Sequence, residues 1–202
     1  MKRNYDKEMQ EQIQRLEGRE PLLLHSCCGP CSTAVIERLA EVFAITVFFY
    51  NPNIDEEGEY QRRKENQIRY IEQRYGRDGD VKFLEGRYDP ERFLCFGEPL
   101  SAEAEGGPRC TLCFELRLRE TAAVALEKNF KFFATTLTVS PMKDPAVINE
   151  IGEGLASEWG VEYLVSDFKK KAGYQRSIQL SKEYGLYRQH FCGCSFSRRE
   201  ME

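Results

Sequence analysis

The chain has 202 residues, of which 41% are hydrophobic and 12% aromatic. This suits one α/β domain with a substantial core and is short for two domains. The formal net charge of −4 excludes a general electrostatic attraction to nucleic acid, so a polyanionic partner would need a local basic patch. The sequence contains neither an apolar run of about 18 residues nor the apolar core of a signal peptide, so we expect a cytoplasmic protein without membrane association.

The first part of the chain predicts a helix, a strand and a cysteine-rich turn. Apolar residues recur every three or four positions among charges at the N-terminus. We therefore assign residues 1–20 to an amphipathic capping helix and residues 21–202 to a single α/β domain. Residues 22–24 follow as a buried strand. After it, Pro30 suits the first position of a helix, which places Cys31 in the first turn, where the helix dipole favours a thiolate.

The rest of the chain alternates β-rich apolar runs with helical periodicity. Residues 97–108 contain many helix breakers and predict a mobile loop. We expect Asp55 to cap the helix after the second strand, and Arg62, Arg63 and Lys64 to face solvent. The remaining strands are predicted at residues 43–50, 81–85, 132–137 and 162–165, and the helices at residues 32–41, 56–75, 90–96, 112–130, 145–159 and 172–184.

This alternation predicts a mostly parallel, five-stranded open sheet with helices on both faces. In such sheets, ligands bind at the carboxyl ends of the strands. Four segments that follow strands should therefore share one rim, which is the predicted site. They are residues 27–31, 51–53, 138–143 and 166–171.

Seven of the eight cysteines occur in three tight groups, which favours a metal centre over a disulfide framework or unrelated core thiols. Zinc and a cubane iron–sulfur cluster each take four ligands. The surplus suggests two adjacent metal sites, or one cluster beside a redox-active thiol pair. Cys95 has apolar neighbours and is expected to be a buried packing residue. The grouped cysteines are Cys27, Cys28 and Cys31, then Cys110 and Cys113, then Cys192 and Cys194.

Together these motifs resemble the QueH-type epoxyqueuosine reductases, metalloenzymes that act in the last step of queuosine synthesis on tRNA. The resemblance covers nearly everything after the N-terminal helix, and several rare motifs occur in the same order. The motifs are L-L-L-H-S-C-C-G-P-C-S at residues 22–32, Y-N-P-N-I at 50–54 followed by E-Y at 59–60, R-C-T-L-C-F at 109–114, T-T-L-T-V-S-P at 135–141 and Y-R-Q-H-F-C-G-C at 187–194.

The resemblance implies a four-iron, four-sulfur (4Fe-4S) cluster beside an additional iron or other divalent metal ion, in a fold related to the adenine-nucleotide-binding α/β domains. It also implies a tRNA anticodon stem-loop as substrate and an external electron donor. No S-G-G-x-D-S phosphate loop is present, so we expect no ATP requirement. We assign Cys28, Cys110, Cys113 and Cys194 to the cluster, and Cys27, Cys31 and Cys192 to the second metal and to catalysis.

Conversion of the epoxide to an alkene requires two electrons and loss of the oxygen as water. We expect the second metal to bind the epoxide oxygen as a Lewis acid while the cluster delivers electrons singly. Candidate proton donors are His25, Tyr50, Tyr60 and Tyr174, each of which could instead pack in the core. The predicted substrate contacts are Tyr50, Asn51, Asn53, Tyr60, Arg109, Ser140, Lys170 and Tyr174.

Basic residues at 169–171 and 198–199 are the expected phosphate contacts, with ordinary solvated charge as the alternative. Two other functions use the same thiols. A zinc-stabilised RNA-binding module would bind RNA without redox turnover, and a thiol–disulfide oxidoreductase would use C-x2-C directly.

Overall fold

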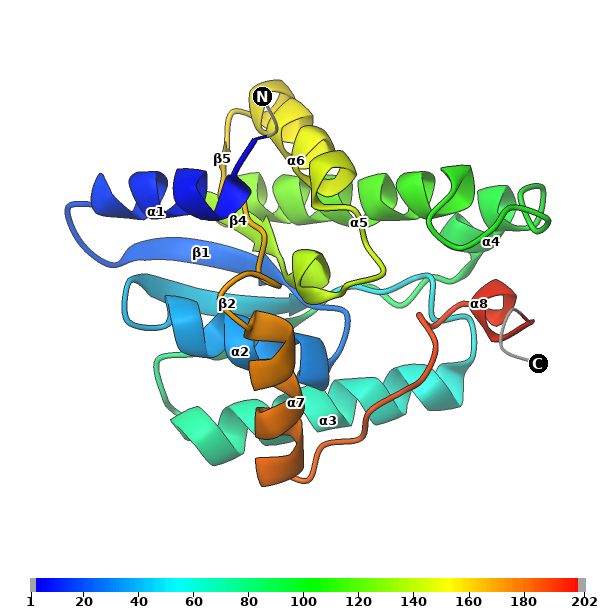
Figure 1. The fold of residues 1–202 in the computed structure, drawn as a ribbon, viewed down its shortest axis with the longest axis horizontal. Coiled ribbons are helices and arrows are strands. Elements are labelled where there is room, and N and C mark those ends of the chain that lie inside the picture. The colour runs from blue at the N-terminus through cyan, green and yellow to red at the C-terminus, as the bar shows by residue number, and fades with distance from the viewer. Residues whose placement is uncertain (1–2, 200–202) are drawn as a thin grey trace.

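Five parallel strands form one open sheet, in the order β3-β2-β1-β4-β5 (Figure 1). The computed structural model describes residues 3–199, and the predictions that fall on residues 1, 2 and 200–202 lie outside it. Every neighbouring pair in the sheet is parallel, which confirms the predicted fold class. The strands are β1 (Glu20–His25), β2 (Phe43–Phe49), β3 (Lys82–Glu85), β4 (Phe132–Thr135) and β5 (Glu162–Tyr163).

Most helices and strands lie close to their predicted positions, but the last strand ends at Tyr163 rather than at residue 165, and a short helix at Ser195–Arg199 was not predicted. Two further differences concern the N-terminal helix and β4. The N-terminal helix is shorter than residues 1–20 and begins where Asn4 caps it. The strand expected at residues 132–137 ends at Thr135, whose hydroxyl oxygen accepts the N–H of Leu137 and starts a short 3-10 helix. The helices are α1 (Tyr5–Gln14), α2 (Gly29–Leu39), α3 (Glu57–Tyr75), α4 (Glu91–Gly97), α5 (Pro108–Glu127), η1 (Thr136–Val139), α6 (Pro145–Trp159), α7 (Gly173–Glu183) and α8 (Ser195–Arg199).

Helices cover both faces of the sheet, and successive side chains of β1 point to opposite faces and pack against different helices. Leu22 and Leu24 pack in the cluster that includes residues of α2 and α3, whereas Leu23 packs in the cluster beneath α5 and α6 (Figure 1). Each buried leucine side chain contributes about 1.5–3 kcal/mol to folding. Because β1 is central and buried on both sides, its carboxyl end is held firmly.

The chain leaves β1 toward β2 and β3, and leaves β4 toward β5 on the other side. The connections after β1 and β4 therefore diverge. Such a reversal in strand order opens a crevice outside the carboxyl ends of the strands. This crevice is where the predicted site lies.

The N-terminal helix lies along the β5 edge of the sheet. Gln12 on α1 donates from Nε2 to the carbonyl oxygen of Tyr163 (3.0 Å), and its Oε1 accepts the N–H of Val165 (3.1 Å). Asp6 pairs with Arg38 of α2 at 2.6 Å. The helix therefore extends the hydrogen bonding of the short edge strand β5. Within residues 3–199, no helix is both long and apolar enough to cross a membrane.

Three predictions about single residues were wrong. Asp55 does not cap α3; its Oδ2 instead accepts the backbone N–H of Ser195 (2.9 Å) at the start of α8. Arg63, expected in solvent, is 1% exposed. Both side chains bind the C-terminal segment, which returns over α3, and local periodicity cannot reveal such contacts. Cys95, expected to be buried, is exposed on the outer side of α4, where Phe93 takes the inward position.

Candidate metal centre

The turn after β1 brings three thiols together. The Sγ atoms of Cys27, Cys28 and Cys31 all lie within 4.8 Å of one another. We call these three residues the thiol triad. Cys28 has extended backbone and stands at the start of α2, so Cys31 falls in the first helical turn as predicted. Gln67 of α3 fixes the turn, because its Oε1 accepts hydrogen bonds from the hydroxyls of Ser26 (2.7 Å) and Ser32 (2.9 Å).

The thiol triad concentrates negative charge on one sulfur. Interaction with the side chains of Cys28 and Cys31 holds the pKa of Cys27 well below its usual range. The same interaction with Cys27 raises the pKa of Cys28 to about 12 and also raises that of Cys31. Of the three thiols, Cys27 is therefore the one that loses its proton most readily, and a thiolate is the form that binds metal or acts as a nucleophile.

A second set of thiols lies beside α5. Cys110 and Cys113 occupy the first turns of this helix, and Cys192 and Cys194 arrive from the C-terminal segment. All four line one small cavity. We call them the α5 thiol group. Burial raises the pKa of Cys113 to about 12, so this thiol holds its proton until a metal displaces it.

The C-terminal segment is held in place by buried polar contacts. Arg63 donates from Nη1 to the carbonyl oxygen of Cys192 (2.9 Å) and from Nε to Glu59 (2.6 Å). The Glu59 carboxylate also accepts the hydroxyl of Tyr187 (3.2 Å). Gln189 donates from Nε2 to Cys28 Sγ (2.9 Å), which links the segment directly to the thiol triad. These contacts connect the segment that carries Cys192 and Cys194 both to α3 and to the thiol triad.

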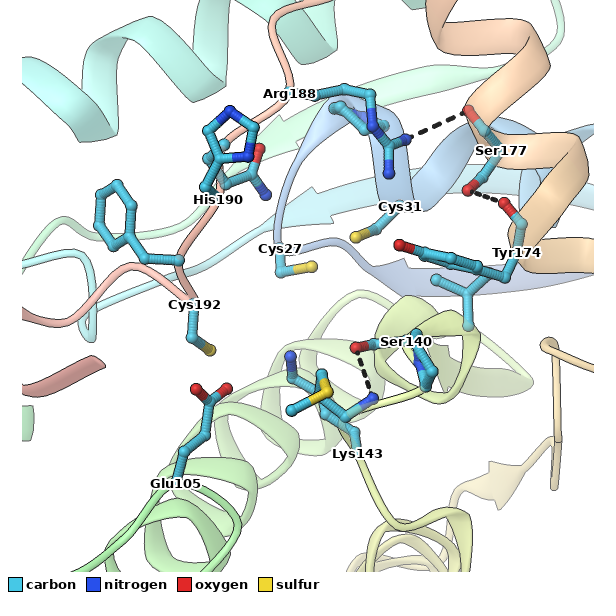
Figure 2. A pocket seen from close by; sticks show the side chains of 16 residues that line it. Cys27, Cys31, Glu105, Ser140, Lys143, Tyr174, Ser177, Arg188, His190 and Cys192 are labelled. Carbon is cyan, nitrogen blue, oxygen red and sulfur yellow. Dashed lines mark hydrogen bonds between the residues drawn. The ribbon is translucent and has the colours of Figure 1, made fainter. Parts of the chain in front are cut away.

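An open cavity of about 430 Å³ lies next to these thiols. Cys27, Cys31 and Cys192 face it, and Lys143 and Glu105 lie below them in the view of Figure 2. The cavity falls in the range of small-molecule sites. Its other polar lining residues are Ser140, Tyr174, Ser177, Arg188, Gln189 and His190.

The structure brings some predicted substrate residues to the thiols and leaves others apart. Ser140 and Tyr174 line the open cavity, and Asn53 and Arg109 line the cavity of the α5 thiol group. Arg109 Nη1 donates to the carbonyl oxygen of Leu100 (2.9 Å), so it ties down part of the loop at residues 97–108. The predicted residues that line neither cavity are Tyr50, Asn51, Tyr60 and Lys170.

His25 is a structural residue. It is fully buried, its Nδ1 lies 2.8 Å from the hydroxyl of Thr135, and its Nε2 lies 3.1 Å from the carbonyl oxygen of Tyr50. A carbonyl can only accept, so Nε2 carries the hydrogen and Nδ1 accepts from Thr135. Burial lowers the pKa of His25 to about 3, so the imidazole is neutral. It has no acidic proton to donate to substrate.

Sequence reasoning missed four polar residues at the site. Lys143 and Glu105 line the open cavity, Gln189 contacts Cys28, and Arg117 lines the cavity of the α5 thiol group. Lys143 ends the predicted rim segment 138–143, which was a usable signal. Arg117 lies seven residues after Cys110 and four after Cys113, a spacing that places all three on one helix face.

An open parallel sheet whose carboxyl rim carries two groups of thiols defines an α/β protein with a sulfur-rich ligand site at its topological switch point. A family model described as "Epoxyqueuosine reductase QueH" matches residues 22–200. The chain belongs to this family, as its motifs predict.

Three individual relatives are similar over most of their length. The epoxyqueuosine reductase QueH of Staphylococcus epidermidis is 42% identical over 200 residues, which span 96% of this chain and 84% of that protein. The epoxyqueuosine reductase QueH of Streptococcus pyogenes is 40% identical, over 97% of this chain and 78% of that protein. The epoxyqueuosine reductase QueH of Thermotoga maritima is 32% identical, over 89% of this chain and 91% of that protein.

Proposed function

We propose that this protein reduces epoxyqueuosine to queuosine in tRNA, at a centre of iron and sulfur held by its seven grouped cysteines. The observation that carries the proposal is that thiols far apart in sequence line two cavities that share Cys192. Cys27, Cys31 and Cys192 line the open cavity of about 430 Å³, and Cys110, Cys113, Cys192 and Cys194 line the other. Membership of a family whose relatives bear this activity in their names supports the choice of reaction.

The donor sets fit two metal sites. Three thiols within 4.8 Å suit a single ion with three protein ligands and one open position, the arrangement of catalytic metal sites. The four thiols of the α5 thiol group match the Cys₄ set of a 4Fe-4S cluster. The charge of Cys113 interacts with those of Cys192, Cys194 and Cys110. This division differs from the sequence-based one by exchanging Cys28 and Cys192.

The reaction breaks both carbon–oxygen bonds of the epoxide, forms a carbon–carbon double bond, and consumes two electrons and two protons to release water. When bound, the iron–sulfur cluster supplies electrons one at a time from an external donor. The protein must therefore hold the modified base, exclude competing water and deliver protons.

Lys143 is the proposed proton donor. Burial lowers the pKa of its ammonium group, but the charges of Cys192, Cys27 and Cys31 outweigh burial and raise that pKa above its ordinary value. Lys143 is therefore protonated in the cavity, close to the thiols that surround the reacting group. Lys169 holds the segment in place, since its Nζ donates to the carbonyl oxygen of Lys143 (3.0 Å).

Tyr174 and the residues around α7 are the proposed tRNA contacts. The Tyr174 ring lines the open cavity and can stack on a base that leaves the anticodon loop (Figure 2). A recess beside α7 contains Lys170, Lys171, Arg38 and Arg176 together with Glu37. Arg176 pairs with Glu37 there, and Arg38 and Lys171 pair with Asp6. Lys170 is exposed there, so it can reach a backbone phosphate. Arg198 instead pairs with Glu56 at 2.6 Å, and the side chain of residue 199 lies outside the described part.

The test is anaerobic turnover of tRNA that contains epoxyqueuosine, with a chemical reductant. Cys27→Ser should abolish reduction, whereas Cys95→Ser, which changes an exposed cysteine outside both groups, should leave it intact. Lys143→Met should lower kcat strongly and change KM little, because it removes a proton donor rather than a binding contact. Full activity of Cys27→Ser with unaltered metal content would contradict the two-site proposal.

The same experiment separates the alternatives. A zinc-stabilised RNA-binding module would bind the tRNA and leave the epoxide unchanged, and its purified form would be colourless. A thiol–disulfide oxidoreductase would reduce disulfide substrates after chelation and without tRNA.

A further inference from the structure

Arg117 is a buried cation whose charge the protein chain does not satisfy. Its side chain is 1% exposed, and its Nε donates to the carbonyl oxygen of Cys113 (3.1 Å). Within residues 3–199, neither Nη1 nor Nη2 has a hydrogen-bond partner, and no carboxylate pairs with the guanidinium. The ring of Phe114 lies 5.6 Å from its central carbon, which compensates a small part of the lost hydration.

Two other fully buried arginines make the difference clear. Arg63 pairs with Glu59 and donates from Nη1 to a backbone carbonyl, and Arg109 donates from Nη1 to the carbonyl oxygen of Leu100. Arg117 alone among these three directs its Nη groups at no oxygen of the described chain. An unpaired buried charge is strongly destabilising, so the site should receive an anion when it is complete.

The surroundings of Arg117 identify that anion. The residue lines the cavity of the α5 thiol group, on the same helix face as Cys110 and Cys113. The charges of Cys113, Cys192, Cys27 and Cys110 all raise the pKa of Arg117, so thiols of both groups lie within electrostatic range of its guanidinium. Four thiols line this cavity, beside the oxygen-bearing side chains of Glu105, Asn53 and Ser197, so sulfur is the most numerous potential acceptor around the guanidinium.

We infer that Arg117 is a positioning residue for the metal centre: its two free Nη groups donate to sulfur of the centre, and its positive charge offsets the negative charge of that centre. The inference rests on the proposed function. A 4Fe-4S cluster with four thiolate ligands is anionic and becomes more so when it accepts an electron. Hydrogen bonds to sulfur and a nearby cation both favour the reduced state, so Arg117 should raise the reduction potential.

The test uses Arg117→Met, which keeps most of the side-chain length and removes the charge. The matched control is Arg119→Met on the same helix, where the guanidinium is exposed and pairs with Glu115 and Glu158. Two properties are measured: the thermal midpoint of the metal-free protein, and the reduction potential of the loaded centre by titration followed with electron paramagnetic resonance.

Arg117→Met should leave the midpoint of the metal-free protein unchanged or raise it, because an uncompensated buried charge is removed. It should also shift the reduction potential to a more negative value and speed loss of iron to a chelator. Arg119→Met should change neither the potential nor the iron loss. Arg117→Lys, which keeps the charge but not the planar fork, should give a smaller shift in the same direction.

An unchanged potential and unchanged iron retention in Arg117→Met would overturn the inference, as would a lower midpoint of the metal-free protein without any shift in potential. If Arg117→Met does not fold, the potential of Arg117→Lys decides the question, and an unchanged value rejects it. If the wild-type protein contains no iron and sulfide, the proposed function is rejected as well. If the wild-type protein holds the centre but Arg117→Met changes neither its potential nor its iron retention, only this inference is rejected.

Discussion

Arg63 on α3 and Cys192 near the C-terminus are joined by a 2.9 Å hydrogen bond from Nη1 to the carbonyl oxygen, across 129 positions of sequence. The same guanidinium pairs with Glu59 at 2.6 Å, so it is fixed before it reaches the C-terminal segment. This contact sets where the third cysteine group lies relative to the other two.

Arg63→Lys should therefore loosen the centre without removing any thiol. A lysine can still pair with Glu59, but a single ammonium cannot span the carboxylate and the Cys192 carbonyl at once. We expect a lower iron content per chain and lower activity, with the fold retained. The measurement is iron content after anaerobic purification beside circular dichroism, and Arg77→Met, an exposed change just after α3, is the control. Iron content equal to that of the wild type would contradict this role of Arg63.

Gly193 separates the last two thiols and has a backbone that other residues resist. Its φ is +135°, and a Cβ there would lie 3.0 Å from Ile54 and 3.2 Å from Nη1 of Arg63. Gly193→Ala should cost about 1–3 kcal/mol of strain and displace Cys192 or Cys194. The free energy of unfolding measured in urea and the iron content should both fall. Gly18→Ala, whose added Cβ would meet nothing within 4 Å, should leave the iron content unchanged. A fully loaded Gly193→Ala protein would show that this geometry is dispensable.

Acid should destabilise the protein through His25. Its pKa is about 3 in the folded protein against an ordinary 6.5, so between these values only the unfolded chain binds the proton. Stability is therefore lost as pH falls from about 6.5 toward 3, by about 1.4 kcal/mol per pH unit. Urea unfolding of the metal-free protein at several pH values measures this slope. His25→Gln should be less stable at pH 7 and have a flatter dependence, and an identical slope would exclude His25 as the cause.

Lys170→Ala should weaken tRNA binding and reduce its salt dependence. Loss of one phosphate contact lowers the slope of log affinity against log salt by about 1. Filter binding at several salt concentrations measures both quantities. Lys128→Ala, beyond the carboxyl end of α5, is the control, because it lies near the amino end of β4 and away from the rim. An affinity equal to that of the wild type at every salt concentration would remove Lys170 from the interface.

Much of the fold was predictable because its signals are local. The alternation of β-rich runs with helical periodicity predicted the parallel sheet, and the first two cysteine groups lie at the starts of α2 and α5 as expected. The position of Cys31 in the first turn of α2 also followed from Pro30. These features depend on neighbours within a few positions.

The contacts of the C-terminal segment were not predictable in this way. Arg63 with Cys192, Asp55 with Ser195 and Gln189 with Cys28 all depend on the path of an irregular segment that has no periodicity. Arg117 was missed for a related reason. An arginine on an amphipathic helix is normally exposed, and only the burial of its neighbours in space marks it as unusual.

The central claim is that the two thiol groups hold an iron–sulfur centre that reduces epoxyqueuosine. The most direct measurement is iron and acid-labile sulfide per chain in anaerobically purified protein, taken together with turnover of tRNA that contains epoxyqueuosine. The account predicts four sulfides and more than four irons per chain, absorption that bleaches on reduction, and conversion of the epoxide. Protein that contains zinc without sulfide, or that binds this tRNA and leaves the epoxide unchanged in the presence of reductant, would contradict it.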